Sequence, residues 1–205
     1  MNPSLSRAPQ RSRRSPAIGR GTRLSHLPGE PGMWLFIFGD LCVFSIMFVA
    51  FLVMRGRHHA MFVEAEHHLD IAYGAVMTLL LLASSLFVVR GVQAQRLSNR
   101  TTAPFVMAIA CGIAFVALKA VEWGSHLRAG QTLVTNHFWN FYYVLTGVHL
   151  VHILVGLVFL TYMSLVVRDP AKVPRHLPYI EGAACFWHMV DLLWIMIFPL
   201  LYLLR

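Results

Sequence analysis

Charged residues and cysteines are both scarce in this sequence of 205 residues. Asp, Glu, Lys and Arg make up 13% of the chain, whereas 57% of it is hydrophobic, and its apolar stretches are too long and too numerous for a soluble domain. The three cysteines, Cys42, Cys111 and Cys185, all lie inside apolar stretches. They are therefore typical of small buried hydrophobic residues, and no disulfide framework or C-x-x-C metal site is available. We predict a polytopic membrane protein.

Several functional motifs are also missing. The sequence has no glycine-rich phosphate loop, no Ser or Cys catalytic triad, and no aromatic platform for nucleic acids. No internal repeat with a period of about 20 to 50 residues is visible, which argues against a transporter built on inverted repeats. The formal net charge of +8 would suit nucleic acid, but membrane topology explains the distribution of basic residues better.

Residues 1–30 contain six arginines, many Ser, Pro and Gly residues, and almost no large apolar residue. Such a segment cannot bury enough apolar surface to fold, so we expect a disordered, Arg-rich tail. Arg13 and Arg14 resemble a twin-arginine export signal. That signal requires an apolar stretch directly afterwards, whereas this chain stays polar through Glu30, so we reject export.

The remaining residues, 31–205, are expected to form one all-α domain, a bundle of five transmembrane helices. About 20 apolar residues cross a hydrocarbon core of roughly 30 Å, and each span must be helical because lipid offers the backbone no hydrogen-bond partner. We expect Trp139, Tyr142 and Tyr143 to form an interfacial aromatic belt, and Pro199 to kink the last helix. The five predicted spans are residues 33–54, 71–89, 103–121, 138–167 and 183–204.

Lys and Arg lie mostly on one side of these spans. Twelve of them fall on the side of the tail and four on the other side. This asymmetry predicts a cytoplasmic N-terminus and a periplasmic C-terminus in a bacterial inner membrane. The twelve are six arginines of the tail, Arg90, Arg96, Arg100, Arg168, Lys172 and Arg175, and the four are Arg55, Arg57, Arg128 and Arg205.

Ionisable residues within the spans fall at two depths, if each helical residue rises about 1.5 Å. The cytoplasmic-side level is predicted to hold Asp40, His188 and Asp191, with Trp187 and Trp194 on the same helix face as Asp191. The periplasmic-side level is predicted to clamp the third span to the fourth. Its members are Lys119, Glu122, His149 and His152. Because isolated charges are unstable in a low-dielectric bundle, we expect the side chains of each level to pair.

Three other interpretations of these residues were considered. They could simply hold five helices together. A shared haem would need two axial histidines at one depth, but His188 is predicted to lie some 14 to 19 Å below His149 and His152. An outer-facing metalloenzyme could use the loop histidines with Glu64, Glu66 and Asp70, although the spacing of membrane di-iron enzymes is absent. The histidines of this outer region, in loops or in the outer third of a helix, are His58, His59, His67, His68, His126, His137, His149 and His152.

Five collinear motifs carry a family resemblance from about Gly32 to Arg205. They are GMWLFIFGDLCVFSIMFVAF, LLLLASS, ALKAVEW, FYYVLTGVHLVHILVGL and EGAACFWHMVDLLW, one from each predicted span. Together they resemble subunit III of the haem–copper oxidases, in its short five-helix bacterial form. The ending DLLWIMIFPLLYLLR and the chain length are most similar to the NorE-type branch associated with nitric oxide reductase.

The resemblance implies roles for particular residues. Asp40 matches a family position that usually carries a carbodiimide-reactive glutamate, so this chain keeps a carboxylate but shortens it by a methylene. The other matches are Glu122 of the EW motif, His149 and His152 of TGxHxxH, Glu181 before the last span, and Trp187, His188, Asp191 and Trp194 of WHxVDxxW. Glu181 thereby joins the predicted cytoplasmic-side network.

The resemblance also implies a function. Family members are accessory subunits without an active site of their own, which pack against catalytic subunit I, hold phospholipid and support proton uptake from the cytoplasm. We therefore expect no cofactor or metal in this chain, and haem and copper, or haem and non-haem iron, in the partner subunit. The alternatives are the outer-facing, His-rich metalloenzyme and an independent proton or solute carrier.

Overall fold

The structure is a computed structural model that describes residues 31–97, 101–169, 171 and 173–204. The predicted disordered tail, residues 1–30, lies outside the described residues. Arg100, Lys172 and Arg205, which contribute to the charge asymmetry, also lie outside them.

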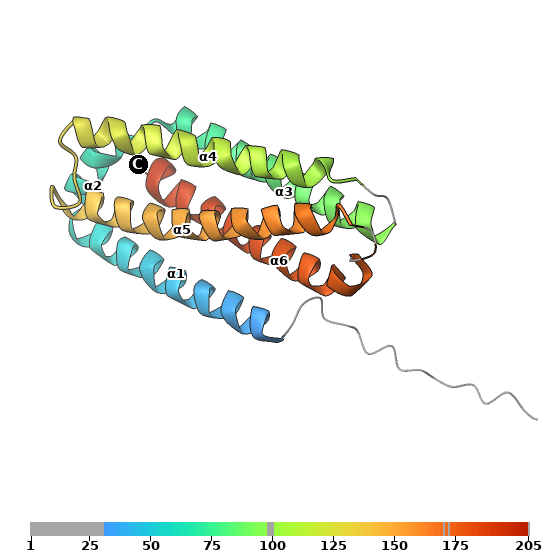
Figure 1. Cartoon of the computed structure of the whole chain (residues 1–205). Coiled ribbons are helices and arrows are strands. Elements are labelled where there is room, and N and C mark those ends of the chain that lie inside the picture. The colour runs from blue at the N-terminus through green and yellow to red at the C-terminus, as the bar shows by residue number, and fades with distance from the viewer. Residues whose placement is uncertain (1–30, 98–100, 170, 172, 205) are drawn as a thin grey trace, which may run out of the picture.

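Over the described residues the chain is all-α, as predicted, and five helices are long and apolar enough to cross a membrane. They run alongside one another as a bundle (Figure 1). The helices are α1 (Pro31–Arg57), α2 (His59–Glu66), α3 (Ile71–Arg96), α4 (Ala103–Arg128), α5 (His137–Val166) and α6 (Val173–Phe198), followed by a π-helical turn, Pro199–Leu203.

The capped starts of α3 and α5 agree with the predicted spans to within one residue, and the differences lie at other helix ends. The Asp70 carboxylate caps α3 by accepting from the amide of Ala72 at 2.8 Å, and the Asn136 side chain caps α5 by accepting from Trp139 at 3.0 Å. Both α3 and α4 extend past their apolar runs to a basic residue in the last turn. The largest difference is α6, which begins at Val173 although its apolar run begins at residue 183.

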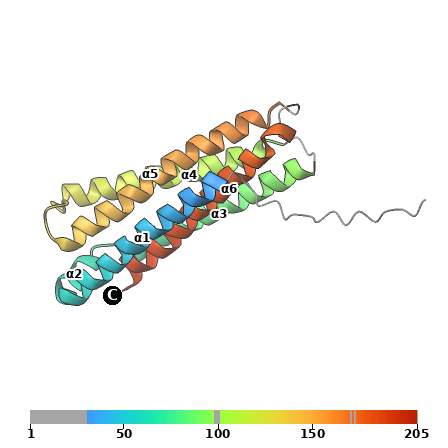
Figure 2. The ribbon, with the colours of Figure 1, turned by 90° about the horizontal axis from the view of Figure 1, so that it is seen from below.

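The short helix α2 was not predicted, and it replaces part of what was expected to be a flexible loop with paired histidines. Phe62 is buried in edge contacts with Phe51 of α1 and Phe138 of α5. Glu66 is fully buried and accepts from both Nε and Nη2 of Arg55, at 3.1 and 3.3 Å. Nη2 of Arg55 also donates to the carbonyl of Leu204. These contacts join α1, α2 and the C-terminal end, which lie together in Figure 2.

The most buried spanning helix is α6, which packs against α5, α3 and α1, whereas α1 is the least buried. Figure 1 also shows that α1 starts well short of the end of the bundle at which α3 ends and α6 begins. We call that end the α6-start end, and the opposite end, which carries α2, the α2 end.

The predicted interfacial belt is wrong. Trp139, Tyr142 and Tyr143 are all buried inside the bundle. Their rings contact one another edge-on or tilted, and Tyr142 and Tyr143 also contact rings of α4. The aromatic cluster therefore packs α5 against α4 and does not anchor the chain at the membrane surface.

Two glycines allow α4 and α5 to approach the large side chain of Trp187 on α6. A Cβ atom at Gly156 would lie 2.6 Å from the indole ring, and one at Gly112 would lie 3.1 Å from it. Neither position has room for a side chain. Small residues at helix interfaces are a common means of close packing in membranes.

We expect Gly156→Ala to lower the free energy of unfolding by about 1–3 kcal/mol, because the added methyl group must displace a buried indole ring. Thermal unfolding of the purified chain in detergent would measure the loss. Gly39→Ala is the matched control on α1, since no atom lies within 4 Å of its Cβ position. Equal stability of the two variants would contradict the tight packing around Trp187.

The π-helical turn at the C-terminus begins at Pro199. Proline has no amide hydrogen and its ring clashes with the preceding turn, so a regular α-helix is interrupted there. The amide of Leu204 donates to the carbonyl of Pro199 at 3.2 Å, and the wider turn leaves Tyr202 fully buried. The predicted irregularity at Pro199 thus takes the form of a π turn that points a tyrosine into the bundle.

Candidate functional site

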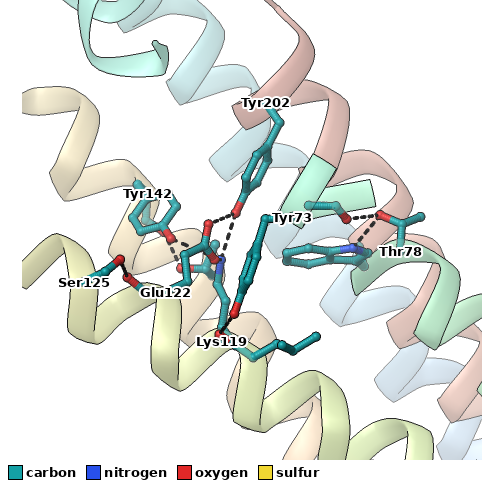
Figure 3. Close-up of polar contacts among 11 residues, drawn as sticks. Tyr73, Thr78, Lys119, Glu122, Ser125, Tyr142 and Tyr202 are labelled. Atoms are coloured by element: carbon teal, nitrogen blue, oxygen red, sulfur yellow. Dashed lines mark hydrogen bonds and ion pairs between the residues drawn. The ribbon is translucent and has the colours of Figure 1, made fainter. Parts of the chain in front are cut away.

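The largest polar cluster in the described interior surrounds Lys119 of α4. Its Nζ lies 2.8 Å from Oε2 of Glu122 and donates to the hydroxyls of Tyr142 and Tyr202 at 3.3 and 3.2 Å. The Tyr202 hydroxyl in turn donates to Oε1 of Glu122 at 2.5 Å. Figure 3 shows these side chains converging from α4, α5 and the π turn. All three donors of the ammonium group are therefore used.

Aromatic rings complete the surroundings of Lys119. Its Nζ lies 4.8 Å from the ring centre of Tyr142, 5.2 Å from that of Trp194 and 5.8 Å from that of Tyr202. A desolvated cation over ring faces gains electrostatic stabilisation. Trp194 also donates from Nε1 to the Thr78 hydroxyl at 3.0 Å, which links α6 to α3 (Figure 3). Trp194 thus belongs to the Lys119 cluster, not to the cytoplasmic-side level where it was predicted.

His149 does not bond to Glu122, as the predicted clamp between the third and fourth spans would require. It is fully buried, with its ring centre 5.9 Å from that of Phe115 and 5.3 Å from that of Trp194. Neither ring nitrogen has a hydrogen-bond partner among the described residues. The hydrogen bond that joins the Lys119 cluster of α4 to α5 is made to the Tyr142 hydroxyl instead.

Asp40 pairs with His152, across the two predicted levels. Its Oδ2 lies 3.3 Å from Nε2 of His152, while Nδ1 of that ring bonds to the Val148 carbonyl at 2.8 Å. A carbonyl only accepts, so Nδ1 carries a hydrogen. In a neutral ring the lone pair of Nε2 would then face the carboxylate. The contact is therefore an ion pair only when His152 carries a hydrogen on both ring nitrogens.

The predicted grouping of Asp40 with His188 and Asp191 is not formed. Nδ1 of His188 lies 2.5 Å from the Ser85 hydroxyl of α3. Asp191 is 4% exposed. The Ser85 hydroxyl is close enough to interact with its carboxylate, but that hydroxyl bonds to His188, and neither carboxylate oxygen has a hydrogen bond of acceptable geometry among the described residues. Asp40 and His188 face different helices, since the first lies against His152 of α5 and the second lies against Ser85 of α3. The helices α1 and α6 themselves meet at this height, because Phe186 of α6 contacts both Phe36 of α1 and the His152 ring.

The two remaining predicted network residues lie apart from these groups. Glu181 forms an ion pair with Arg96 at 2.8 Å, which joins the first turns of α6 to the end of α3. Trp187 is fully buried between Gly112 and Gly156, and its Nε1 has no hydrogen-bond partner in the described part of the chain. Glu181 is therefore at the end of the bundle, and Trp187 is a packing residue.

Sequence reasoning missed the tyrosines that complete the Lys119 cluster. Tyr142 was assigned to a surface belt, and Tyr202 is brought inward by a π turn that hydrophobicity does not reveal. A buried lysine predicts acceptors nearby, and that requirement is the signal that could have found them. Within residues 31–97, 101–169, 171 and 173–204, no three His, Cys, Asp or Glu side chains are grouped to hold a metal ion. The metalloenzyme alternative therefore gains no support.

Comparisons with known proteins agree with this architecture. The sequence model of the family described as Cytochrome c oxidase subunit III matches residues 18–204. Cytochrome c oxidase subunit 3 of Synechocystis sp. is 32% identical over 176 residues, covering 84% of this chain and 74% of the relative. Quinol oxidase subunit 3 of Bacillus subtilis is 27% identical over 175 residues, with 84% and 85% covered. This multi-pass membrane chain belongs to the cytochrome c oxidase subunit III family.

Proposed function

We propose that the chain is a non-catalytic accessory subunit of a respiratory haem–copper oxidase or nitric oxide reductase complex. The observation that carries this proposal is the family match along the whole helical bundle. The buried ionisable groups are consistent with it, because Lys119 pairs with Glu122 within α4 and Asp40 of α1 lies against His152 of α5. In this proposal catalytic subunit I is the partner, and it holds the haem together with copper or non-haem iron.

The charge asymmetry of the sequence supports a cytoplasmic N-terminus and a periplasmic C-terminus in the inner membrane of a bacterium. In that orientation the α6-start end faces the cytoplasm. A pocket of about 220 Å³ lies at this end between α3 and α6, and its lining includes Gln93, Arg96 and Glu181. Cys185 and His188 form its inner part. The pocket thus gives the cytoplasmic surface an approach to His188 and its partner Ser85.

We assign the support of proton uptake to buried groups deeper in the bundle. Asp191 is a buried carboxyl group with no hydrogen bond among the described residues, and Asp40 lies 3.3 Å from Nε2 of His152. Groups of this kind order water and hold protons within reach of a catalytic neighbour. A groove of about 340 Å³ lined by Met33, Phe36 and Phe159, among others, would hold the acyl chains of bound phospholipid.

The finer branch is also a proposal. The C-terminal sequence and the chain length favour the NorE-type branch, whose partner reduces nitric oxide. The relatives named above are subunits of cytochrome c and quinol oxidases, so an oxygen-reducing partner is the second candidate. Both candidates use the same bundle as an accessory subunit.

Affinity purification of the full chain in mild detergent tests the proposal. We expect a larger complex with the absorption spectrum of haem to co-purify with the tagged chain. Reduced-minus-oxidised spectra and turnover with oxygen or nitric oxide would then identify the partner's reaction. A chain that is isolated alone from cells, with no haem at any detergent concentration, would instead support an independent carrier.

A further inference from the structure

A polar pocket at the α2 end is used by none of the roles proposed above. It has a volume of about 170 Å³ and lies between the start of α3 and the last turns of α4. Val121, on its wall, is 65% exposed, so the pocket opens on the surface that faces the membrane. Its lining residues are His68, Asp70, Tyr73, Val121, Glu122, Ser125 and His126.

The hydroxyl groups of this pocket present acceptors. The Tyr73 hydroxyl donates its hydrogen to the carbonyl of Leu118 at 2.7 Å, and the Ser125 hydroxyl donates to the carbonyl of Glu122 at 2.7 Å (Figure 3). A hydroxyl group has one hydrogen, so only lone pairs remain on both oxygens. Neither hydroxyl can donate to a ligand while these backbone bonds persist.

The other oriented groups follow the same rule. Nδ1 of His126 bonds at 2.7 Å to the Oε1 atom of Gln131, which only accepts, so Nε2 of the neutral ring is an acceptor. Both capping bonds to Asp70 end on its Oδ1, at 2.8 and 3.4 Å, which leaves Oδ2 available. The pocket therefore presents at least four hydrogen-bond acceptors to a ligand. They are the hydroxyl oxygens of Tyr73 and Ser125, Nε2 of His126 and Oδ2 of Asp70.

Two carboxylates, those of Asp70 and Glu122, line the pocket, and among the described residues no lysine or arginine does. Lys119 pairs with Glu122 from inside the bundle, so Asp70 is the carboxylate left for a ligand, next to the α3 amides that it caps. A ligand suited to this site is a small cation that carries several hydrogen-bond donors. A primary ammonium group has one positive charge and three such donors.

We propose that this pocket binds a primary ammonium group. Because it opens on the membrane-facing surface near the helix ends, the head group of phosphatidylethanolamine is one source of that group, and a free amine in solution is the other. A quaternary ammonium group has the same charge but no N–H donor, so the site should discriminate against it. This inference does not depend on the accessory role of the chain.

The test uses the purified full chain in nanodiscs of phosphatidylcholine that contain increasing fractions of phosphatidylethanolamine. Native mass spectrometry counts the ethanolamine lipids retained, and competition with ethanolamine chloride is compared with competition by choline chloride. Asp70→Asn removes the charge but keeps a capping oxygen for α3, and should weaken binding about tenfold through loss of a charge-assisted bond. Asp169→Asn is the matched control, because Asp169 also caps a backbone amide, that of Ala171.

Retention of phosphatidylethanolamine that ethanolamine displaces and choline does not would support the head group as the ligand. An increase in melting temperature with ethanolamine chloride, without retained lipid, would support a free amine. Equal effects of choline and ethanolamine, or binding that Asp70→Asn leaves unchanged, would overturn the proposal.

Discussion

Lys119→Met is expected to reduce the free energy of unfolding by about 3–5 kcal/mol, as for other broken buried ion pairs. Methionine fills a similar volume, so the loss comes from electrostatics and not from a cavity. The Glu122 carboxylate would stay buried with Tyr202 as its remaining side-chain donor, and the hydroxyls of Tyr142 and Tyr202 would lose the donor that they share. Unfolding of the purified chain by SDS in mixed micelles would measure the difference.

Two further variants separate the charge from the packing. The double variant Lys119→Met with Glu122→Leu should recover much of the loss, because replacing a whole buried pair by apolar residues is often close to neutral. Arg96→Met breaks the ion pair with Glu181, in which the arginine side chain is 58% exposed, and should cost less than about 1 kcal/mol. A Lys119→Met loss as small as that of Arg96→Met would mean that the buried pair contributes little to stability.

The Lys119 cluster also shows how far sequence reasoning extends. The ion pair of Lys119 with Glu122 could be predicted from the sequence, because the two residues are three apart on one helix and an unpaired charge inside a membrane is energetically unfavourable. Their tyrosine partners could not, since Tyr202 depends on a π turn. A membrane span is visible in the sequence as a run of apolar residues. The hydrogen-bond partner of a side chain on another helix depends on how each helix is rotated, tilted and offset in the bundle, and a single apolar run does not contain that information.

The predicted pairing of Asp40 with His188 fails for the same reason. Residues 173–182, which contain two prolines and several polar side chains, lie outside the predicted span 183–204. In the structure Pro174 lies in the first turn of α6 and Pro178 is inside the helix, so the helix starts ten residues earlier than its apolar run. His188 of this helix faces Ser85 of α3, whereas Asp40 faces His152 of α5. Depth alone therefore does not identify the partners, because the rotation of each helix decides which neighbour a side chain meets.

Asp191→Leu is the second variant for which we expect a large effect, and that effect is on function. The carboxylate of Asp191 has no hydrogen-bond partner among the described residues, and removing a buried, unsatisfied polar group is neutral or stabilising where the apolar replacement fits. The variant should therefore unfold no more easily than the natural chain. In the complex, we expect turnover to decline several times faster during prolonged assays, because the proposed proton-holding group is gone.

The combination of these two results distinguishes a functional group from a structural one. A carboxyl group kept for packing would lower stability when removed and would leave the turnover of the assembled complex unchanged. A group kept for proton uptake should show the reverse, since unsatisfied polar groups are retained where function requires them. Leu192→Ala is the control, because Leu192 neighbours Asp191 on α6 but is exposed at the surface of the chain. Full turnover throughout long assays of the Asp191→Leu complex would remove Asp191 from the proposed mechanism and leave the Asp40–His152 pair as the candidate proton-holding group.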